Sequence, residues 1–243
     1  MAQDTYDFYT SQSAKLLKDF DRMIRQVKNP LITRFGEVDY KMMAASVREE
    51  FQRLIPLLPY VGGEQPFTQF VISSGWFLAF HRVMLARGAS TRETGELAYT
   101  LSQTYLARVP GFARRLLGYM SFSPKYLRKL RKRAEESQRH PYQRGYVYSY
   151  VEGDGVNYDY GVDYRQCATW TLFQEQGAVE LTPYLCACDH LYSEMLNWGL
   201  TRTTTLGEGG EVCDFRFKRG GPTRVRSSVI DFEEMERRCR ARR

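Results

Sequence analysis

The sequence predicts an α+β protein in which a helical N-terminal half packs with a C-terminal antiparallel sheet and two helices. Two observations lead to this prediction. Apolar residues recur at helical spacing through much of residues 1–140, which is typical of amphipathic helices. After about residue 142 the period changes to two, which is typical of strands with one buried face. We therefore expect a helical region over 1–140 and a sheet-containing region over 141–243, joined as one compact unit.

Helices are expected in the first region over 6–27, 38–58, 67–86 and 90–108. Asn29–Pro30 supplies a stop after the first of them, because proline lacks an N–H and disfavours a helix before it. The third is apolar on nearly every face, as in a helix at the centre of a fold. The fourth begins with a capping signal, Ser90 followed three residues later by Glu93.

The second region begins with two alternating runs over 146–151 and 158–164, each rich in tyrosine. Gly153-Asp154-Gly155 separates them, and these residue types tolerate the positive φ of hairpin turns. An antiparallel pair with a tyrosine-rich face is expected. Two helices then follow over 166–176 and 182–197, and alternation returns over 212–218.

The net charge of +7 is concentrated in two segments. Residues 114–133 carry eight basic and no acidic side chains, and residues 216–243 carry ten basic and four acidic ones. The other 195 residues therefore sum to −7. Leucines interleave the 114–133 segment at helical spacing, which predicts a basic amphipathic helix. Because no nucleic-acid-binding motif accompanies it, we expect this helix to cover the core, meet an acidic partner or lie on an anionic membrane surface, rather than bind nucleic acid.

Hydropathy and cysteine content narrow the class of protein further. The longest apolar runs fall far short of the about 20 residues that a membrane span needs. Five cysteines without regular spacing argue against a secreted disulfide framework and for reduced thiols. We therefore expect a cytoplasmic protein.

The expected helix over 182–197 carries the first candidate site. Helical spacing turns Cys188 toward the apolar face, whereas Cys186 and His190 share a more polar face. One interpretation is a nucleophilic Cys188 thiolate whose proton is accepted by Asp189 or His190. The other is a buried structural cysteine, since free cysteine packs as a small hydrophobe.

A second candidate site lies on the expected strand over 212–218. Alternation puts Cys213 on one face with two phenylalanines, and Asp214 and Arg216 on the other. Arg216 is a candidate for binding a substrate carboxylate through its forked donors, with Asp214 as its positioning residue or as a base. The same pattern also fits an apolar stripe beside a solvated ion-pair face.

Cysteine spacing favours no metal site. Cys167, Cys188 and Cys213 are separated by 21 and 25 residues, and no Cys-x-x-Cys pair is present. Structural zinc sites use four ligands with tight local pairs. We therefore expect no metal, and no motif indicates another cofactor or an oligomeric state.

The segments around these cysteines resemble one known family. Residues 167–177, 183–189 and 203–217 (TTTLGEGGEVCDFRF) resemble the L-2-amino-thiazoline-4-carboxylic acid hydrolase family. Members of that family show a cysteine that opens a helix, a cysteine followed by aspartate on the next helix, and a glycine-rich turn before Cys-Asp-Phe-x-Phe. These positions are matched here by Cys167, Cys188 with Asp189, Gly210, and Cys213 to Phe217.

This resemblance and the cysteine pattern lead to the main hypothesis, a hydrolase of a C–N bond in a small cyclic amidine or amide carboxylate. A thiolate of Cys188 or Cys213 would attack the ring carbon, with Asp189 or Asp214 beside it. The substrate-binding residues would be Cys167, Tyr160, Tyr164, His190 and Arg216.

A second hypothesis is a ligand-binding or biosynthetic accessory protein without hydrolytic chemistry. The glycine-rich turn and Cys-x-Phe also resemble the end of bacteriochlorophyll 4-vinyl-reductase-type domains, which are small-ligand-binding modules of helices and an antiparallel sheet. With 17 tyrosines and 14 phenylalanines in the chain, the same cavity would hold an apolar or tetrapyrrole-like molecule. A third hypothesis is an interaction protein that docks through the basic helix.

Overall fold

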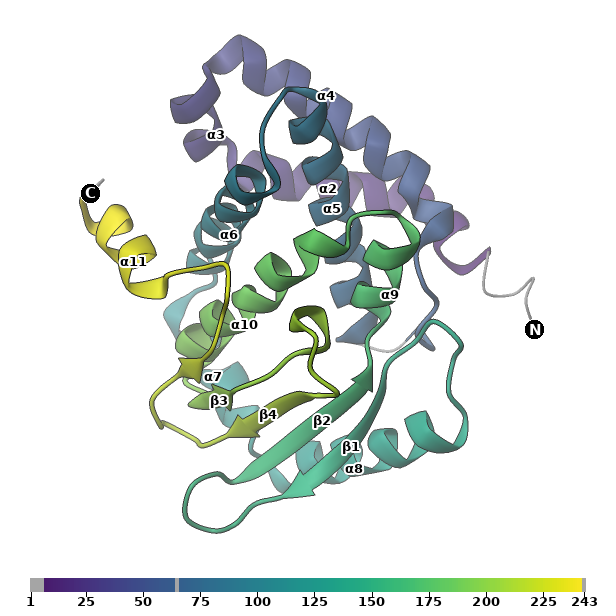
Figure 1. The fold of residues 1–243 in the computed structure, drawn as a ribbon, viewed down its shortest axis with the longest axis vertical. Helices are drawn as coiled ribbons and strands as arrows, with labels where there is room; N and C mark the ends of the chain where they lie inside the picture. The colour runs from purple at the N-terminus through teal and green to yellow at the C-terminus, as the bar shows by residue number, and fades with distance from the viewer. Residues whose placement is uncertain (1–6, 64–65, 242–243) are drawn as a thin grey trace.

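Helices fill the N-terminal half of the chain and a mostly antiparallel sheet lies in the C-terminal half (Figure 1). The computed structural model describes residues 7–63 and 66–241. In this part the strand order in the sheet is β1-β2-β4-β3-β5, and two helices lie between β2 and β3 in the chain. The predicted α+β fold is confirmed. Within the same residues, no helix is long and apolar enough to cross a membrane.

The N-terminal helices agree best with the sequence where a strong local signal is present. α5 (Phe67–Ala86) has the expected bounds, and α6 (Thr91–Ala107) begins at the expected capping box. The hydroxyl of Ser90 accepts from the amide of Glu93 at 3.2 Å, and the Glu93 carboxylate accepts from the amide of Ser90 at 2.9 Å. The capping box satisfies two amides that the first helical turn leaves without partners.

The region before α5 contains more helices than expected. Its described part comprises a helical stretch over 7–10, α2 (Ser13–Gln26), α3 (Lys28–Phe35), α4 (Glu37–Leu54) and the 3₁₀ turn η1 (Ile55–Leu57). Pro30, predicted as a stop, lies in the first turn of α3, where a missing N–H removes no intrahelical bond. The first helix was expected from Tyr6, a residue that lies outside the described part of the chain.

The basic 114–133 segment forms parts of two helices, α7 (Gly111–Met120) and α8 (Pro124–Arg139). The break falls at Ser123, whose hydroxyl caps α8 by accepting from the Tyr126 amide at 3.2 Å. Pro124 takes the first helical position, which it favours. α8 packs along β1 and supplies Leu130 and Ala134 to a small core on the sheet.

The sheet consists of β1 (Val147–Glu152), β2 (Tyr160–Gln166), β4 (Cys213–Phe217), β3 (Leu200–Arg202) and β5 (Arg224–Val225). The expected antiparallel pair of β1 and β2 is present, and β4 pairs antiparallel with both β2 and β3. β5 was not predicted and pairs parallel with β3. The register sets Val162 opposite Phe215 and Tyr164 opposite Cys213. These side chains therefore share one face of the sheet.

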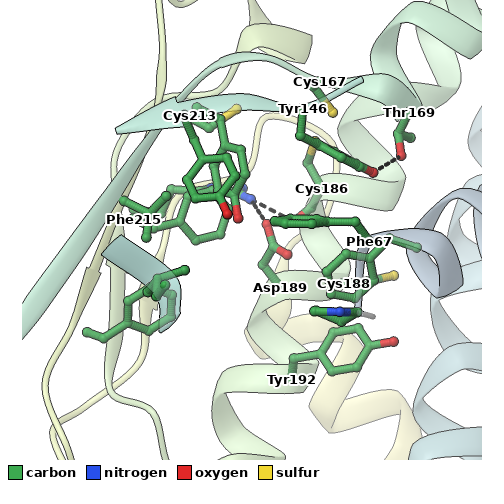
Figure 2. Close-up of a pocket in the computed structure, with 18 of the residues that line it drawn as sticks. Phe67, Tyr146, Cys167, Thr169, Cys186, Cys188, Asp189, Tyr192, Cys213 and Phe215 are labelled. Atoms are coloured by element: carbon green, nitrogen blue, oxygen red, sulfur yellow. Dashed lines mark hydrogen bonds and ion pairs between the residues drawn. The ribbon is translucent and has the colours of Figure 1, made fainter. Parts of the chain in front are cut away.

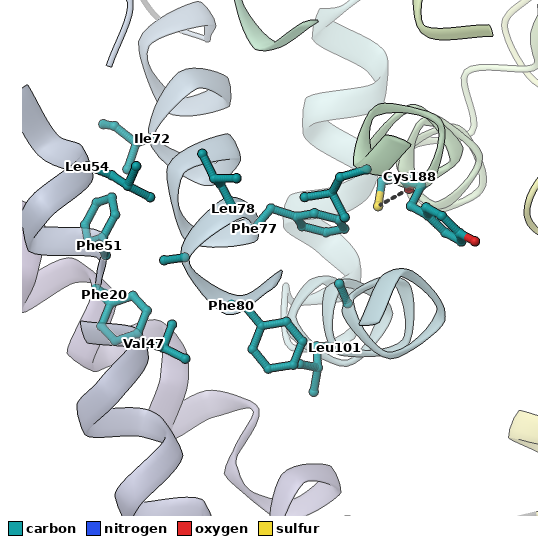
Figure 3. Packing of buried hydrophobic residues seen from close by; sticks show 14 of the residues in the cluster. Phe20, Val47, Phe51, Leu54, Ile72, Phe77, Leu78, Phe80, Leu101 and Cys188 are labelled. Atoms are coloured by element: carbon teal, nitrogen blue, oxygen red, sulfur yellow. Dashed lines mark hydrogen bonds between the residues drawn. The ribbon is translucent and has the colours of Figure 1, made fainter. Parts of the chain in front are cut away.

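Two helices connect β2 to β3 as the sequence predicts, namely α9 (Ala168–Glu175) and α10 (Thr182–Leu196). Asn197 ends α10 in the left-handed conformation at φ 54°, a position that asparagine tolerates. A short helix, α11 (Phe232–Ala241), follows the sheet. The main core joins α2, α4, α5 and α6 to α9 and α10, so it contains residues from both sides of residue 140 (Figure 3).

Candidate active site

A cavity of about 250 Å³ lies between the helix-facing side of the sheet and the helices α5, α8 and α10 (Figure 2). Alternation along β2 directs Tyr160 and Tyr164 into it, and the neighbouring strands add Tyr148 and Phe215. Phe67, at the start of α5, stacks on Tyr146 with ring centroids 4.8 Å apart. The cavity wall is therefore predominantly aromatic, which is typical of a site for a small organic molecule.

One face of α10 forms the floor of this cavity. Thr182, Cys186, Asp189 and Tyr192 recur every three or four residues and all line it, as residues on one side of a helix do. Cys188 lies at the border of this face. Its side chain lines the cavity but is also buried in the main core, with 4% of its surface exposed.

Four thiols meet at the cavity. Cys167 comes from the start of α9, Cys186 and Cys188 from α10, and Cys213 from β4. All four are free thiols, and the side chain of the fifth cysteine, Cys239, lies outside the described part. Among the described residues, no group of three or more histidine, cysteine and acidic side chains is arranged to hold a metal ion.

Burial disfavours the thiolate form of these cysteines. It raises the pKa of Cys188 and that of Cys213 to about 12, and it holds the pKa of Cys186 well above its usual range. Cys188 and Cys213, the nucleophile candidates from the sequence, are therefore protonated thiols near neutral pH. Cys188 also donates to the carbonyl oxygen of Tyr184, with 3.7 Å between sulfur and oxygen, as a structural thiol does.

Cys167 differs because it occupies the N-terminal capping position of α9. Burial raises the pKa of its thiol, but the backbone amides of Thr169 and Trp170 act in the opposite direction. Such amides at a helix N-terminus favour a thiolate. The Thr169 hydroxyl lies 3.1 Å from the Tyr146 hydroxyl and 2.8 Å from that of Ser74, which fixes the helix start against the cavity wall (Figure 2).

Asp189 and Arg202 form an ion pair at the same cavity as the four thiols. The guanidinium of Arg202 is buried and also donates to the carbonyl oxygens of Cys186 at 2.8 Å and Arg226 at 3.1 Å. Asp189 retains 31% side-chain exposure and faces the cavity. Burial raises the pKa of its carboxyl group, while Arg202 acts in the opposite direction. Asp189 is the only carboxyl group among the described residues that line the cavity.

Asp214 and Arg216 lie on the other face of the sheet, away from the four thiols. The Asp214 carboxylate accepts from the amides of Thr203 and Thr204, each at 2.8 Å, and so fixes the loop after β3. Arg216 donates to the carboxylate of Asp163 at 2.6 Å. Neither side chain lines the cavity. Asp214 and Arg216 therefore lie on a face of hydrogen bonds and ion pairs, as in the alternative interpretation of the sequence.

His190 points to a different side of α10 from the thiols. Its ring stacks on Phe232 with centroids 4.1 Å apart, and its Nδ1 atom lies 3.5 Å from the Tyr99 hydroxyl oxygen. It lines a separate cavity of about 230 Å³ between α6, α10 and α11. The structure therefore does not bring His190 to Cys188.

Three cations at the cavity were not singled out from the sequence, namely Arg202 on β3, and Lys129 and Arg133 on α8. The alternation of Leu200 and Arg202 on a strand is a weak signal that this arginine points inward. Lys129 and Arg133 are four residues apart and therefore share one face of α8 with the buried Leu130. Their position on the helix, rather than their charge, distinguishes these two residues from the other cations of the basic segment as cavity residues.

The fold and the cavity together define a two-layer α+β protein with a small-molecule pocket lined by thiols and tyrosines. The sequence model of one family, L-2-amino-thiazoline-4-carboxylic acid hydrolase, matches residues 83–217. This match covers more than half of the chain, and the protein belongs to that family. The match runs from the end of α5 to the end of β4, so it contains all four cavity cysteines. Comparison with curated proteins and with solved structures gave no match.

Proposed function

We propose that the protein hydrolyses a C–N bond in a small cyclic amidine carboxylate bound in this cavity, with a cavity thiol as the nucleophile. The observation that carries the proposal is the convergence of four cysteines, Asp189 and Arg202 on one aromatic pocket inside the family match. Membership of the hydrolase family supports a small-molecule substrate. The cavity volume of about 250 Å³ suits a single small ring.

Cys167 is the nucleophile in this proposal, in place of the sequence-favoured Cys188 and Cys213. Among the four thiols it alone occupies a helix N-cap position, and two backbone amides there oppose the effect of burial, whereas Cys213 has one such amide, that of Leu206. A thiolate is the reactive form of cysteine, so the thiol with the best support for negative charge is preferred. Cys188 and Cys213 then serve as packing residues of the cavity wall.

The thiolate of Cys167 adds to the amidine carbon of the substrate. The Asp189 carboxylate accepts the thiol proton of Cys167 and passes it to the ring nitrogen, which takes a second proton from the exocyclic amino group as the ring C–N bond breaks. Water then adds to the same carbon and returns a proton to Asp189. The bond between that carbon and Cys167 breaks, which releases the product and restores the thiolate.

Lys129 and Arg133 take the role of carboxylate binding that the sequence assigned to Arg216. They are the cations at the α8 side of the cavity, whereas Arg202 is buried and paired with Asp189. A guanidinium or ammonium group at the rim can bind the substrate carboxylate without first breaking a buried ion pair. This arrangement orients the ring toward the thiols.

The test is turnover of 2-amino-thiazoline-4-carboxylate by the wild-type protein and by Cys167→Ser, Cys188→Ala and Cys213→Ala. We expect Cys167→Ser to lower kcat by on the order of 10³-fold and the other two variants to stay within about tenfold of wild type. Circular dichroism spectra control for folding. Full activity in all three variants would exclude thiol catalysis, and loss only in Cys188→Ala or Cys213→Ala would exclude Cys167 as the nucleophile.

The pH profile gives a second measurement on the same reaction. Burial raises the pKa of Cys167, so little thiolate is present in the free protein near neutral pH. We therefore expect kcat/KM to rise as the pH increases above 7, since the thiolate fraction of the free enzyme grows. A profile that is flat or falls in this range contradicts a thiolate nucleophile.

The raised thiol pKa values also support a second candidate function, a ligand-binding or accessory protein without hydrolysis. In that case the aromatic cavity holds an apolar molecule and all four cysteines pack as small hydrophobes. Native mass spectrometry of the purified protein then detects a bound molecule, and the thiols resist alkylation until the protein unfolds. Rapid alkylation of one cavity thiol in the native protein contradicts this alternative.

A further inference from the structure

α7 exposes an apolar stripe that the described part of the chain leaves uncovered. Phe112, Leu116 and Met120 are 71%, 56% and 52% exposed. They follow one another at intervals of four residues and therefore lie on one side of the helix. Contiguous exposed apolar surface of this kind marks an interaction site.

The helix is held with this stripe facing outward. Gly118 is the buried residue of α7, and it packs against the end of α10 so closely that an added Cβ atom would lie 2.1 Å from the carbonyl oxygen of Leu196. The guanidinium of Arg219 covers the Tyr119 ring at 4.6 Å from its centroid. Both contacts fix the orientation of α7 on the body of the protein.

Exposed basic residues lie on the same helix and on the first turns of the helix that follows it. Arg115 on α7 and Lys125 and Arg128 on α8 are exposed, and none of the three forms an ion pair with another described residue. The sequence has no acidic residue between Glu96 and Glu135. The surface therefore combines exposed apolar side chains with positive charge that nothing in the described chain neutralises.

We propose that α7 and the first turns of α8 form a peripheral binding surface for anionic lipid membranes. A membrane surface complements both features at once, because acyl chains can contact the apolar stripe and anionic headgroups can pair with Arg115, Lys125 and Arg128. A second copy docked through the same face would set like charges against each other. An acidic polypeptide would match the basic residues, but it would complement Phe112 and Leu116 only if apolar side chains stood at matching positions, whereas every anionic membrane supplies both.

Vesicle co-sedimentation of the full chain tests the proposal, with phosphatidylcholine vesicles compared with vesicles that also contain phosphatidylglycerol. We expect binding to the anionic vesicles only, with loss of binding at high salt. The double variant Phe112→Ser with Leu116→Ser should weaken binding by about tenfold or more, and Arg115→Glu with Arg128→Glu should abolish it. These side chains are exposed, so the variants should keep the wild-type circular dichroism spectrum.

The matched control is Val38→Ser with Met42→Ser. These residues are also four apart on a helix and are 72% and 50% exposed, but Glu37 and Asp39 lie beside them. Binding should be unchanged in this variant. The proposal is overturned by equal binding to neutral vesicles, by no binding to anionic ones, or by equal loss in the control. It is also overturned if polyglutamate binds more tightly than vesicles, or if sedimentation velocity shows a dimer that the Phe112 and Leu116 changes dissociate.

Discussion

Replacing Arg202 by methionine removes the cation that balances the carboxylate of Asp189. The guanidinium is 1% exposed, and besides Asp189 it donates to two carbonyl oxygens, those of Cys186 and Arg226. Methionine occupies a similar volume and carries no charge or donor. The substitution therefore leaves a carboxylate facing a largely aromatic cavity without its partner.

We expect Arg202→Met to lower the free energy of unfolding by about 3–5 kcal/mol, the usual cost of removing one partner from a buried ion pair. Asp189→Asn should cost about 1–3 kcal/mol, because the amide oxygen can still accept a hydrogen bond. The double variant restores neutrality. Its cost should fall below the sum of the two single costs by roughly 1–3 kcal/mol.

The loss in free energy of unfolding caused by Arg202→Met, its stability deficit, should also depend on pH. Burial raises the folded-state pKa of Asp189, and loss of Arg202 raises it further. A carboxyl group whose pKa is raised in the folded state stabilises the fold at pH values below its pKa in the unfolded state. This stabilisation is lost as the pH rises through its pKa in the folded state. The deficit should therefore be smaller near about pH 4 than at neutral pH.

Urea denaturation of the wild type and the three variants, followed by tryptophan fluorescence, measures these free energies. Arg202→Lys serves as the matched control, since it keeps the charge and loses the forked donors. Additive costs in the double variant would refute the coupling. An equal deficit of Arg202→Met at both pH values would refute the electrostatic account of the pair.

Three further predictions address the cavity rim and the core. Lys129→Ala should raise the KM for a carboxylate substrate about tenfold with little change in kcat, whereas Lys132→Ala, which changes a lysine paired with Glu136 outside the cavity, should leave both unchanged in steady-state assays. Gly95→Ala should destabilise the protein by about 1–3 kcal/mol in urea denaturation, because the added Cβ would lie 2.3 Å from the Tyr184 ring. Burial lowers the pKa of His81, so stability should fall as the pH drops below about 6.5; His81→Leu should remove this dependence in denaturation curves at several pH values.

Much of the fold could be predicted because its elements carry local signals. The capping box at Ser90 and the unbroken apolar run of α5 each depend on a few neighbouring residues. β5 spans only Arg224–Val225, and two residues carry no periodicity. α2 ends at Gln26, close to the expected stop, but Pro30 lies in the first turn of a further helix, α3, whose start could not be located from its composition.

The candidate site was harder to predict because the side chains of residues that are neighbours in the sequence can point to different faces of a strand or helix. Asp214 follows Cys213 directly, but successive side chains of a strand point to opposite faces, so the carboxylate lies away from the cavity. His190 is two residues from Cys188, and this separation on a helix also turns the two side chains apart. The partner of Asp189 is Arg202, from a strand after the end of α10, and only the packed fold brings them together.

The basic segment over 114–133 supplies cations both to the cavity and to the outer surface. The salt dependence of substrate binding and of membrane binding should distinguish these two groups. Lys129 and Arg133 face the cavity, whereas Arg115 on α7 and Lys125 and Arg128 on α8 are exposed and do not line it. A membrane is held by several exposed charges, and the Debye length falls to about 3 Å at 1 M salt, so binding should be lost steeply as ionic strength rises. A substrate carboxylate meets only the two rim cations, so its KM should rise less. Vesicle binding and KM measured over one salt series test this division, and parallel losses of both would contradict it.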